Sequence, residues 1–360
     1  MDTTTATASQ TPVLAADVAA YLKRRGRWSP LEIAFWIFAF ASIWLFPDKY
    51  LILKDTAILA LFALSLDLIL GYAGIISLGQ AAFFGVAGYF SGLVAKYGII
   101  DEPIIALVCS GLVAAAFGFV TSFLVLRGSD LTRLMVTLGV SLMLGEIANR
   151  YANITGGADG LQGVDIAPIL GRWNFDLYGH NGYVYCLIVL FVCFVIARRI
   201  VYSPFGLSLR AVKGNALRAA AIGIPVKWRL VAIYTIAAGF AGIAGGLLTQ
   251  TTAFCSLDVF SLDRSADLLL VLIIGGTGYL YGGLIGAVIY KFLQDWLATL
   301  TPQYWQFWIG LVLVVIVLVG RERVEGWIAA ARGSLVRLGG RAWTRIRPRS
   351  AALGGAIDGS

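Results

Sequence analysis

Polar side chains inside apolar segments are the places where this sequence could carry out chemistry or transport. Asp67 interrupts the apolar run ALFALSLDLIL, and Ser77 and Gln80 lie in the stretch GYAGIISLGQAAFFG at residues 71–85. A carboxylate deep in a membrane is costly and is usually functional, whereas one near the end of a span can reach the polar interface. Both interpretations remain open for Asp67, which lies toward the end of its apolar run.

The glycines of the same stretch have two explanations. Glycine costs a helix about 1 kcal/mol relative to alanine, so a reason is needed for Gly71, Gly74, Gly79, Gly85 and Gly88. One explanation is close packing, because small residues let membrane helices approach each other. The other is a break in the helix at residues 73–79, which is tolerated at membrane depth where protein or a watery cavity covers it. In that case the residues facing a translocation path would be Asp67, Gly74, Ser77 and Gln80.

A second glycine-rich segment reads IIGGTGYLYGGLIGA at residues 273–287. Its density of glycine resembles that of residues 71–88, and it predicts a bend between two short apolar runs. Paired broken segments surround the solute path in many membrane transporters. Simple helix packing would also account for these glycines, so the sequence leaves both explanations open.

No set of residues is suited to catalysis or to metal binding. His180 is the sole histidine, the four cysteines are scattered without a CxxC pair, and no nucleophile stands beside a general base. Metal sites in proteins need several such ligands. Two opposite-charge pairs have the helical i, i+4 spacing, Glu146–Arg150 and Lys291–Asp295. We expect them to be structural pairs near span ends.

The composition is that of a membrane protein with several spans. Of 360 residues, 59% are hydrophobic and 13% are charged, and the mean hydropathy is +0.82. A soluble domain is about 25% charged. Because a span needs about 20 apolar residues and must satisfy its own backbone hydrogen bonds, the sequence predicts an all-α polytopic membrane protein with about eight to ten transmembrane helices, some short or broken.

Basic residues cluster at span ends and in both tails, and the net charge is +8. This is the positive-inside pattern, so it indicates cytoplasmic termini and contact with membrane lipid rather than with nucleic acid. We expect a cytoplasmic segment at residues 1–28, a transmembrane domain at residues 29–320 and a basic cytoplasmic tail at residues 321–360.

A basic segment between two apolar runs reads SPFGLSLRAVKGNALRAAAIGIP at residues 203–225. Ser203 and Pro204 form a helix start, and Gly223 forms a stop. The pattern predicts one helix over residues 204–223, too short and too charged to span a membrane. Its basic residues lie on one side and an apolar face on another. Such a helix can lie on the membrane surface or dock into a partner protein, and the periodicity leaves both open.

Five blocks of the sequence, taken in order, resemble one family of transport proteins. They are LDLILGYAGIISLGQAAFFG, TGGADGL, GLSLRAVKGNALRAAAIGIPV, AAGFAGIAGGL and GGTGYLYGGLIGA. Together they resemble the permease subunits of bacterial ABC importers for branched-chain amino acids, in particular the LivM type. The resemblance covers residues 50–320 approximately, and its strength lies in the order of the blocks rather than in any one of them.

The resemblance implies a multi-pass protein of the bacterial inner membrane with no chemistry and no cofactor of its own. It implies a second, LivH-like permease subunit, two cytoplasmic ATPase subunits and a periplasmic solute-binding protein as partners. The sequence contains no GxxxxGK[ST] loop to cradle phosphates. ATP would therefore be bound by the partner subunits.

The resemblance also assigns roles to individual residues. The helix at 204–223 is similar to the coupling helix that enters a cleft on the ATPase, which would give coupling roles to Arg210, Ala211, Lys213, Asn215, Arg218, Ala221 and Gly223. The motif TGGADGL predicts a turn by itself. As a family block it would shape an outer mouth facing the binding protein, formed by Thr155, Gly156, Gly157, Asp159 and Gly160.

Three positions depart from the family pattern. Asp67 stands where asparagine is common, Gln80 stands where histidine is frequent, and residues 213–215 lack the usual acidic residue. An ion-coupled secondary transporter is the alternative function, because such carriers embed ionisable residues, and Asp67 is the one expected deep in a span. The solute is expected to be a branched-chain amino acid or a related small polar molecule, chosen largely by the external binding protein.

Overall fold

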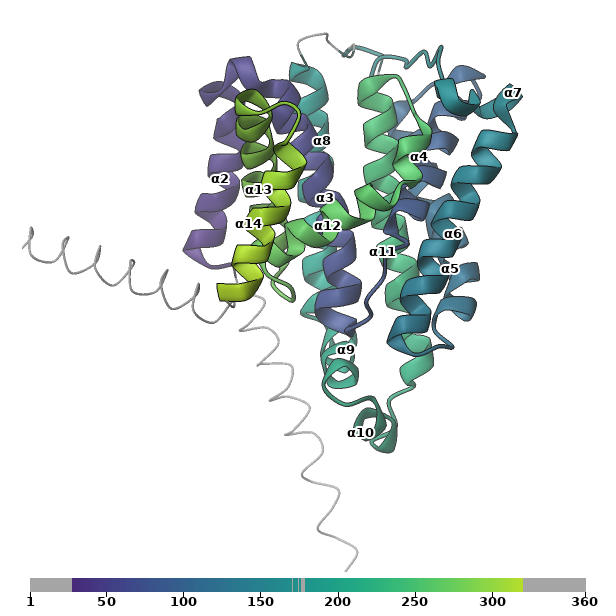
Figure 1. Ribbon diagram of the computed structural model, residues 1–360, viewed down its shortest axis with the longest axis vertical. Helices are drawn as coiled ribbons and strands as arrows, with labels where there is room; N and C mark the ends of the chain where they lie inside the picture. The colour runs from purple at the N-terminus through teal and green to yellow at the C-terminus, as the bar shows by residue number, and fades with distance from the viewer. Residues whose placement is uncertain (1–27, 170, 174, 176–178, 320–360) are drawn as a thin grey trace, which may run out of the picture. The chain divides into compact units, whose positions relative to one another are not determined.

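The computed structural model describes residues 28–169, 171–173, 175 and 179–319 (Figure 1). The chain separates into two compact units, residues 1–293 and 294–360. The α-helices are α2 Pro30–Leu45, α3 Tyr50–Ala73, α4 Gln80–Lys96, α5 Pro103–Val125, α6 Asp130–Arg150, α7 Ala152–Thr155, α8 His180–Val201, α9 Pro204–Gly214, α10 Ala216–Ala221, α11 Val226–Thr252, α12 Leu262–Gly275, α13 Leu280–Leu300 and α14 Trp305–Val319. The expected tails at 1–28 and 321–360 lie outside the described residues, apart from Trp28.

Within the described residues, five helices are long and apolar enough to cross a membrane, namely α3, α5, α6, α8 and α11. A sixth candidate is the pair α12–α13, whose axes differ by 111°. The prediction of an all-α polytopic protein with some short or broken helices is confirmed. Helices α2, α4 and α14 have only 16, 17 and 15 residues, and the segment predicted to bend at residues 273–287 does so. The count of eight to ten crossings stays a prediction.

Helices α3 and α11 form the centre of the first unit. In the most apolar 18-residue stretch of each helix, 89% of α3 and 72% of α11 are buried, compared with 17% of α6. Glycine permits the close approach of α11 to its neighbours: a Cβ on Gly245 would lie 1.9 Å from the Phe84 carbonyl oxygen, and one on Gly242 would lie 2.3 Å from the Ala114 methyl group. Small residues at membrane helix contacts have this role because they let backbones meet.

The segment predicted as one helix at 204–223 is two helices, so that prediction is wrong in this respect. Asn215 has an extended backbone (φ −160°, ψ 105°), and its Oδ1 accepts a hydrogen bond from the Arg218 N–H at 2.9 Å. Asparagine favours such caps over helix interiors because its side chain competes for backbone donors. The stop is confirmed, since Gly223 has φ +87°. Figure 1 shows α9 at the lower end of the long helices and α10 beyond it.

Candidate functional site

The break predicted after the first glycines is present. Helix α3 ends with Gly74 in the left-handed conformation (φ +74°), and the Ile75 N–H reaches back to the Ile69 carbonyl at 3.2 Å. The chain then runs without helix to Gln80, where α4 begins. A helix end of this kind leaves carbonyl groups of the last turn without helical donors. The polar groups that satisfy them define the site.

The break lies against α6, and the two explanations for the glycines both hold. The Leu78 N–H donates to Thr137 Oγ1 at 3.2 Å, and a Cβ on Gly79 would lie 2.8 Å from the Thr137 carbonyl oxygen. Farther along α4, a Cβ on Gly85 would lie 2.3 Å from the Phe260 ring. Glycine is therefore required both where the chain turns and where neighbouring groups pack on it.

A second break separates α12 from α13 and meets the first. Gly276 and Gly278 have φ of +94° and +81°. The Gly278 N–H donates to Asp67 Oδ1 at 2.7 Å, and a Cβ on Gly71 would lie 2.5 Å from the Gly278 nitrogen. The two glycine-rich segments, compared in the sequence only by their composition, are thus in contact. Asp67 is fully buried and is bonded to the second break rather than extended toward water.

Two of the predicted coupling residues point toward the helices of this chain. The Lys213 ammonium donates to the Gly71 carbonyl at 2.6 Å. The Arg210 guanidinium lies 5.4 Å from the centre of the Tyr72 ring, so α9 contacts two consecutive residues of the last turn of α3. Lys213 is nevertheless exposed, as are the other predicted residues, Ala211, Asn215, Arg218, Ala221 and Gly223.

Ser77 and Gln80 are buried at the first break, each about 1% exposed. The Ser77 hydroxyl oxygen accepts a hydrogen bond from the Gly79 N–H at 3.2 Å. Both polar atoms of the Gln80 amide are covered, and within the described residues neither has a hydrogen-bond partner. Buried amides are almost always bonded, so Gln80 is an exception that its own packing does not explain. Its place on a translocation path stays a prediction.

The motif TGGADGL forms the predicted turn. Gly156, Gly157 and Gly160 have φ of +82°, +57° and +75°. The Thr155 hydroxyl donates to the Ala148 carbonyl, and Asp159 is exposed. A Cβ on Gly156 would lie 1.9 Å from the Gly160 carbonyl oxygen, so the fold of this turn requires glycine. Its role as an outer mouth is untested by these contacts.

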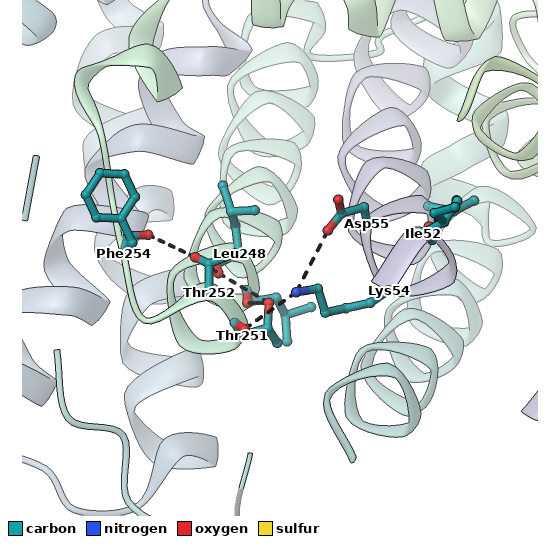
Figure 2. A network of polar contacts seen from close by, with 9 residues as sticks. Ile52, Lys54, Asp55, Leu248, Thr251, Thr252 and Phe254 are labelled. Carbon is teal, nitrogen blue, oxygen red and sulfur yellow. Dashed lines mark hydrogen bonds and ion pairs between the residues drawn. The ribbon is translucent and has the colours of Figure 1, made fainter. Parts of the chain in front are cut away.

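Sequence reasoning missed a second ionisable residue buried in a span. Lys54 on α3 is 6% exposed; its Nζ lies 3.5 Å from the Thr251 carbonyl and 4.0 Å from Asp55 Oδ1 (Figure 2). Helix α11 ends at Thr252, and a cation is favourable near a helix C-terminus. The Thr252 hydroxyl donates to the Leu248 carbonyl at 2.7 Å, and its Oγ1 lies 2.9 Å from the Phe254 carbonyl oxygen. A lysine inside the apolar run YLILKDTAILALF was the available signal.

One predicted ion pair does not form. Glu146 and Arg150 are both exposed at the end of α6, and the ion pairs of the described residues do not include them. The spacing placed the two on one helix face, but exposed pairs gain little from contact because water solvates each charge. Lys291–Asp295 stays a prediction.

A hollow of about 380 Å³ lies between α2, α3, α8 and α13, away from the breaks. Its lining is almost entirely apolar and includes Phe35, Trp36, Phe38, Leu53, Leu187 and Leu284. A charged amino acid would leave its ammonium and carboxylate unpaired there, which is costly. The hollow is therefore unsuited to a polar solute, and the breaks hold the polar groups instead.

Comparison with known proteins identifies the family. The family described as the permease component of branched-chain amino acid transport systems matches residues 50–317. The high-affinity branched-chain amino acid permease protein LivM of Salmonella typhimurium is 25% identical over 80% of this chain and 71% of its own length. The probable permease protein LivH of Methanocaldococcus jannaschii is 25% identical over 64% and 74%, and the ribose import permease protein RbsC of Bacillus subtilis is 31% identical over 43% and 53%.

No solved structure matches this chain. The family match covers well over half of the sequence and includes α3, α4, α9 and both breaks. Together with the apolar helices, it makes the protein a multi-pass protein of the inner membrane. The chain belongs to the branched-chain amino acid transport permease family.

Proposed function

We propose that this chain is a permease subunit of a bacterial ABC importer that moves a branched-chain amino acid or a related small polar solute. Separate ATPase subunits supply the energy, so the chain itself binds no cofactor. The observation that carries the proposal is the contact of the short helix α9 with the end of α3, where Lys213 bonds to the Gly71 carbonyl at 2.6 Å. A motion imposed on α9 from outside the bundle would act directly on the broken segment.

The exposed side of α10 is the proposed contact surface for an ATPase. Leu217 is 83% exposed and Ile222 is 74% exposed, with Arg218 beside them. The sequence analysis assigns no role to these two apolar residues. Exposed apolar residues beside an arginine suit a protein contact, because arginine is enriched at such contacts. The same composition suits a membrane surface, and the experiment below separates the two.

Leu217→Asp is expected to prevent the ATPase subunit from binding, because an acidic group would replace the central apolar anchor of the contact. The measurement is co-purification of the ATPase with the tagged permease from membranes, together with ATP-dependent uptake of labelled leucine into vesicles. Loss of one interface anchor costs roughly 2 kcal/mol or more, about thirtyfold in affinity.

Ile99→Asp is the matched control, since Ile99 is 69% exposed in the loop between α4 and α5. It should leave co-purification unchanged. Normal co-purification of the Leu217→Asp variant would argue for a membrane-surface role of α10. Uptake driven by an ion gradient in vesicles that contain no ATPase would favour the secondary carrier.

Helix α6 offers a surface for the second permease subunit. Among the five candidate spans it has the lowest mean hydropathy, 1.5, and the smallest buried share, 17%. Exposed residues recur along it at intervals of three and four: Thr132, Met135, Gly139, Leu142, Glu146 and Asn149. Polar residues on a span usually face protein rather than lipid, and an exposed seam with this spacing fits a packed helix.

A photo-crosslinking amino acid at position 139 is expected to capture the second permease subunit, identified by its own tag. A Cβ on Gly139 would meet no atom of the described residues within 4 Å, so a probe is expected to be tolerated at this position. The control is the same probe at Val120 on α5, which is 68% exposed. Equal capture from both positions would show that α6 is not the specific contact.

The outer turn at residues 155–160 is the proposed contact for the periplasmic solute-binding protein. Its glycines fix the backbone, and Asp159 remains exposed. The turn is also joined to the loop after α11, since the Leu161 N–H donates to the Cys255 carbonyl at 2.7 Å. A rigid outer surface joined to α11 could transmit docking of the binding protein to the centre of the bundle.

A further inference from the structure

The last turn of α3 is held by groups from two other parts of the chain. On one side, the Lys213 ammonium bonds to the Gly71 carbonyl at 2.6 Å. Gly71 is among the last four residues of α3, whose carbonyls have no helical donor. A cation at a helix C-terminus is also favoured by the helix dipole. The contact therefore gives a hydrogen-bond donor to a carbonyl group that the end of the helix leaves without one.

On the other side, Asp67 holds the break between α12 and α13. Its Oδ1 accepts the Gly278 N–H at 2.7 Å, across 211 residues of sequence. Gly278 lies two residues before the start of α13, where backbone N–H groups lack helical acceptors and an acidic group is favourable. Asp67 and Gly71 are four residues apart and so lie on one face of α3. One helical turn thus carries both contacts.

The Lys213 side chain also fills the space beside the glycines. A Cβ on Gly74 would lie 3.0 Å from Lys213 Cγ, and one on Gly278 would lie 3.9 Å from Lys213 Nζ. The stem of the lysine therefore passes the left-handed residue that ends α3, and its ammonium lies near the second break. A displacement of α9 must either move these segments or break the contact.

We propose that Lys213 is the positioning residue that couples α9 to both membrane breaks, through the Gly71 carbonyl and, by way of Asp67, Gly278. The proposal rests on the proposed function, in which α9 and α10 contact the ATPase. It differs from the expectation that Lys213 binds the ATPase itself. Lys213, although exposed, acts through its bond to the Gly71 carbonyl of this chain, whereas Leu217 and Arg218 act on the ATPase.

Lys213→Met tests the proposal because methionine keeps an unbranched side chain beside Gly74 and removes the ammonium. The full complex of permeases and ATPases is purified and placed in lipid vesicles together with its solute-binding protein. The measurements are ATPase co-purification, ATP hydrolysis, uptake of labelled leucine, and maleimide labelling of a Ser77→Cys reporter with and without a non-hydrolysable ATP analogue. Labelling of the native cysteines is measured in the complex that keeps Ser77 and is subtracted from that of the reporter complex.

The expected result is a complex that assembles and still hydrolyses ATP, but whose membrane-spanning part no longer changes conformation when nucleotide binds. Uptake should fall by roughly fivefold or more, as for a lost coupling between sites, and the nucleotide-dependent change in Ser77→Cys labelling should disappear. Lys213→Arg should restore part of the response because it returns a cation. The control is Lys227→Met, an exposed lysine at the start of α11, which should behave like the parent.

Three outcomes would overturn the proposal. The first is a normal labelling response in the Lys213→Met complex. The second is a Ser77→Cys reporter that does not respond to nucleotide even in the complex that keeps Lys213. The third is loss of ATPase binding in Lys213→Met while Leu217→Asp still binds the ATPase. The last result would place Lys213 in the ATPase contact itself. Failure of the parent to bind any ATPase would instead contradict the proposed function, so the two failures are distinguishable.

Discussion

Gln80→Leu is expected to stabilise the protein against heat and to abolish transport. The Gln80 amide is buried, and neither of its polar atoms has a partner within the described residues. A buried unbonded polar group costs about 1–3 kcal/mol, and an apolar side chain of similar size removes that cost. A residue kept at such a cost is expected to serve the solute path, where its amide would bond to the solute or to water.

The measurements for Gln80→Leu are the thermal unfolding midpoint in detergent and the uptake of labelled leucine by the assembled complex. The matched control is Gln250→Leu, because Gln250 is also buried but each of its two polar atoms has a hydrogen-bond partner. Its Nε2 donates to the Pro103 carbonyl at 2.9 Å, and its Oε1 accepts from the Tyr185 hydroxyl at 3.1 Å. The control should lower the midpoint. A lowered midpoint with normal uptake in Gln80→Leu would make Gln80 a structural residue.

Gly71→Ala is expected to cause a large loss of stability, because the added methyl group falls where the two glycine-rich segments meet. The new Cβ would lie 2.1 Å from Asp67 Oδ1 and 2.5 Å from the Gly278 nitrogen. The second of these is backbone, which cannot rotate away, so the two breaks would have to separate. Overpacking a tight contact costs about 1–3 kcal/mol and sometimes more, and here it would also strain the Asp67–Gly278 hydrogen bond.

The free energy change for Gly71→Ala can be followed by thermal unfolding and by the yield of monodisperse protein. Gly139→Ala is the control for stability, because its Cβ meets nothing within 4 Å and alanine favours a helix by about 1 kcal/mol. The control should be neutral or stabilising. Equal stability of both variants would mean that the two breaks are not in contact in the folded protein.

The helix ends and the glycine positions were largely predictable because they depend on local chemistry. The start of α4 at Gln80, the turn at 155–160 and the stop at Gly223 follow from residues that favour caps, turns or positive φ. Asn215 was a weaker signal. The sequence pattern places it inside one continuous helix. Its preference for a cap position prevails because residues 213–218 are all exposed, so few packing contacts hold the helix straight there.

The sequence by itself determined the class of protein, since its apolar content and its distribution of basic residues permit only a bundle of membrane helices, and the ordered blocks indicated the family. Only the tertiary structure decided the partners: Asp67 with Gly278, Lys213 with Gly71, and Lys54 with Thr251. The physical reason is that periodicity fixes where a side chain lies around its own helix. Which group meets it depends on how distant segments pack, and that packing is set by close contacts between glycines and neighbouring backbones.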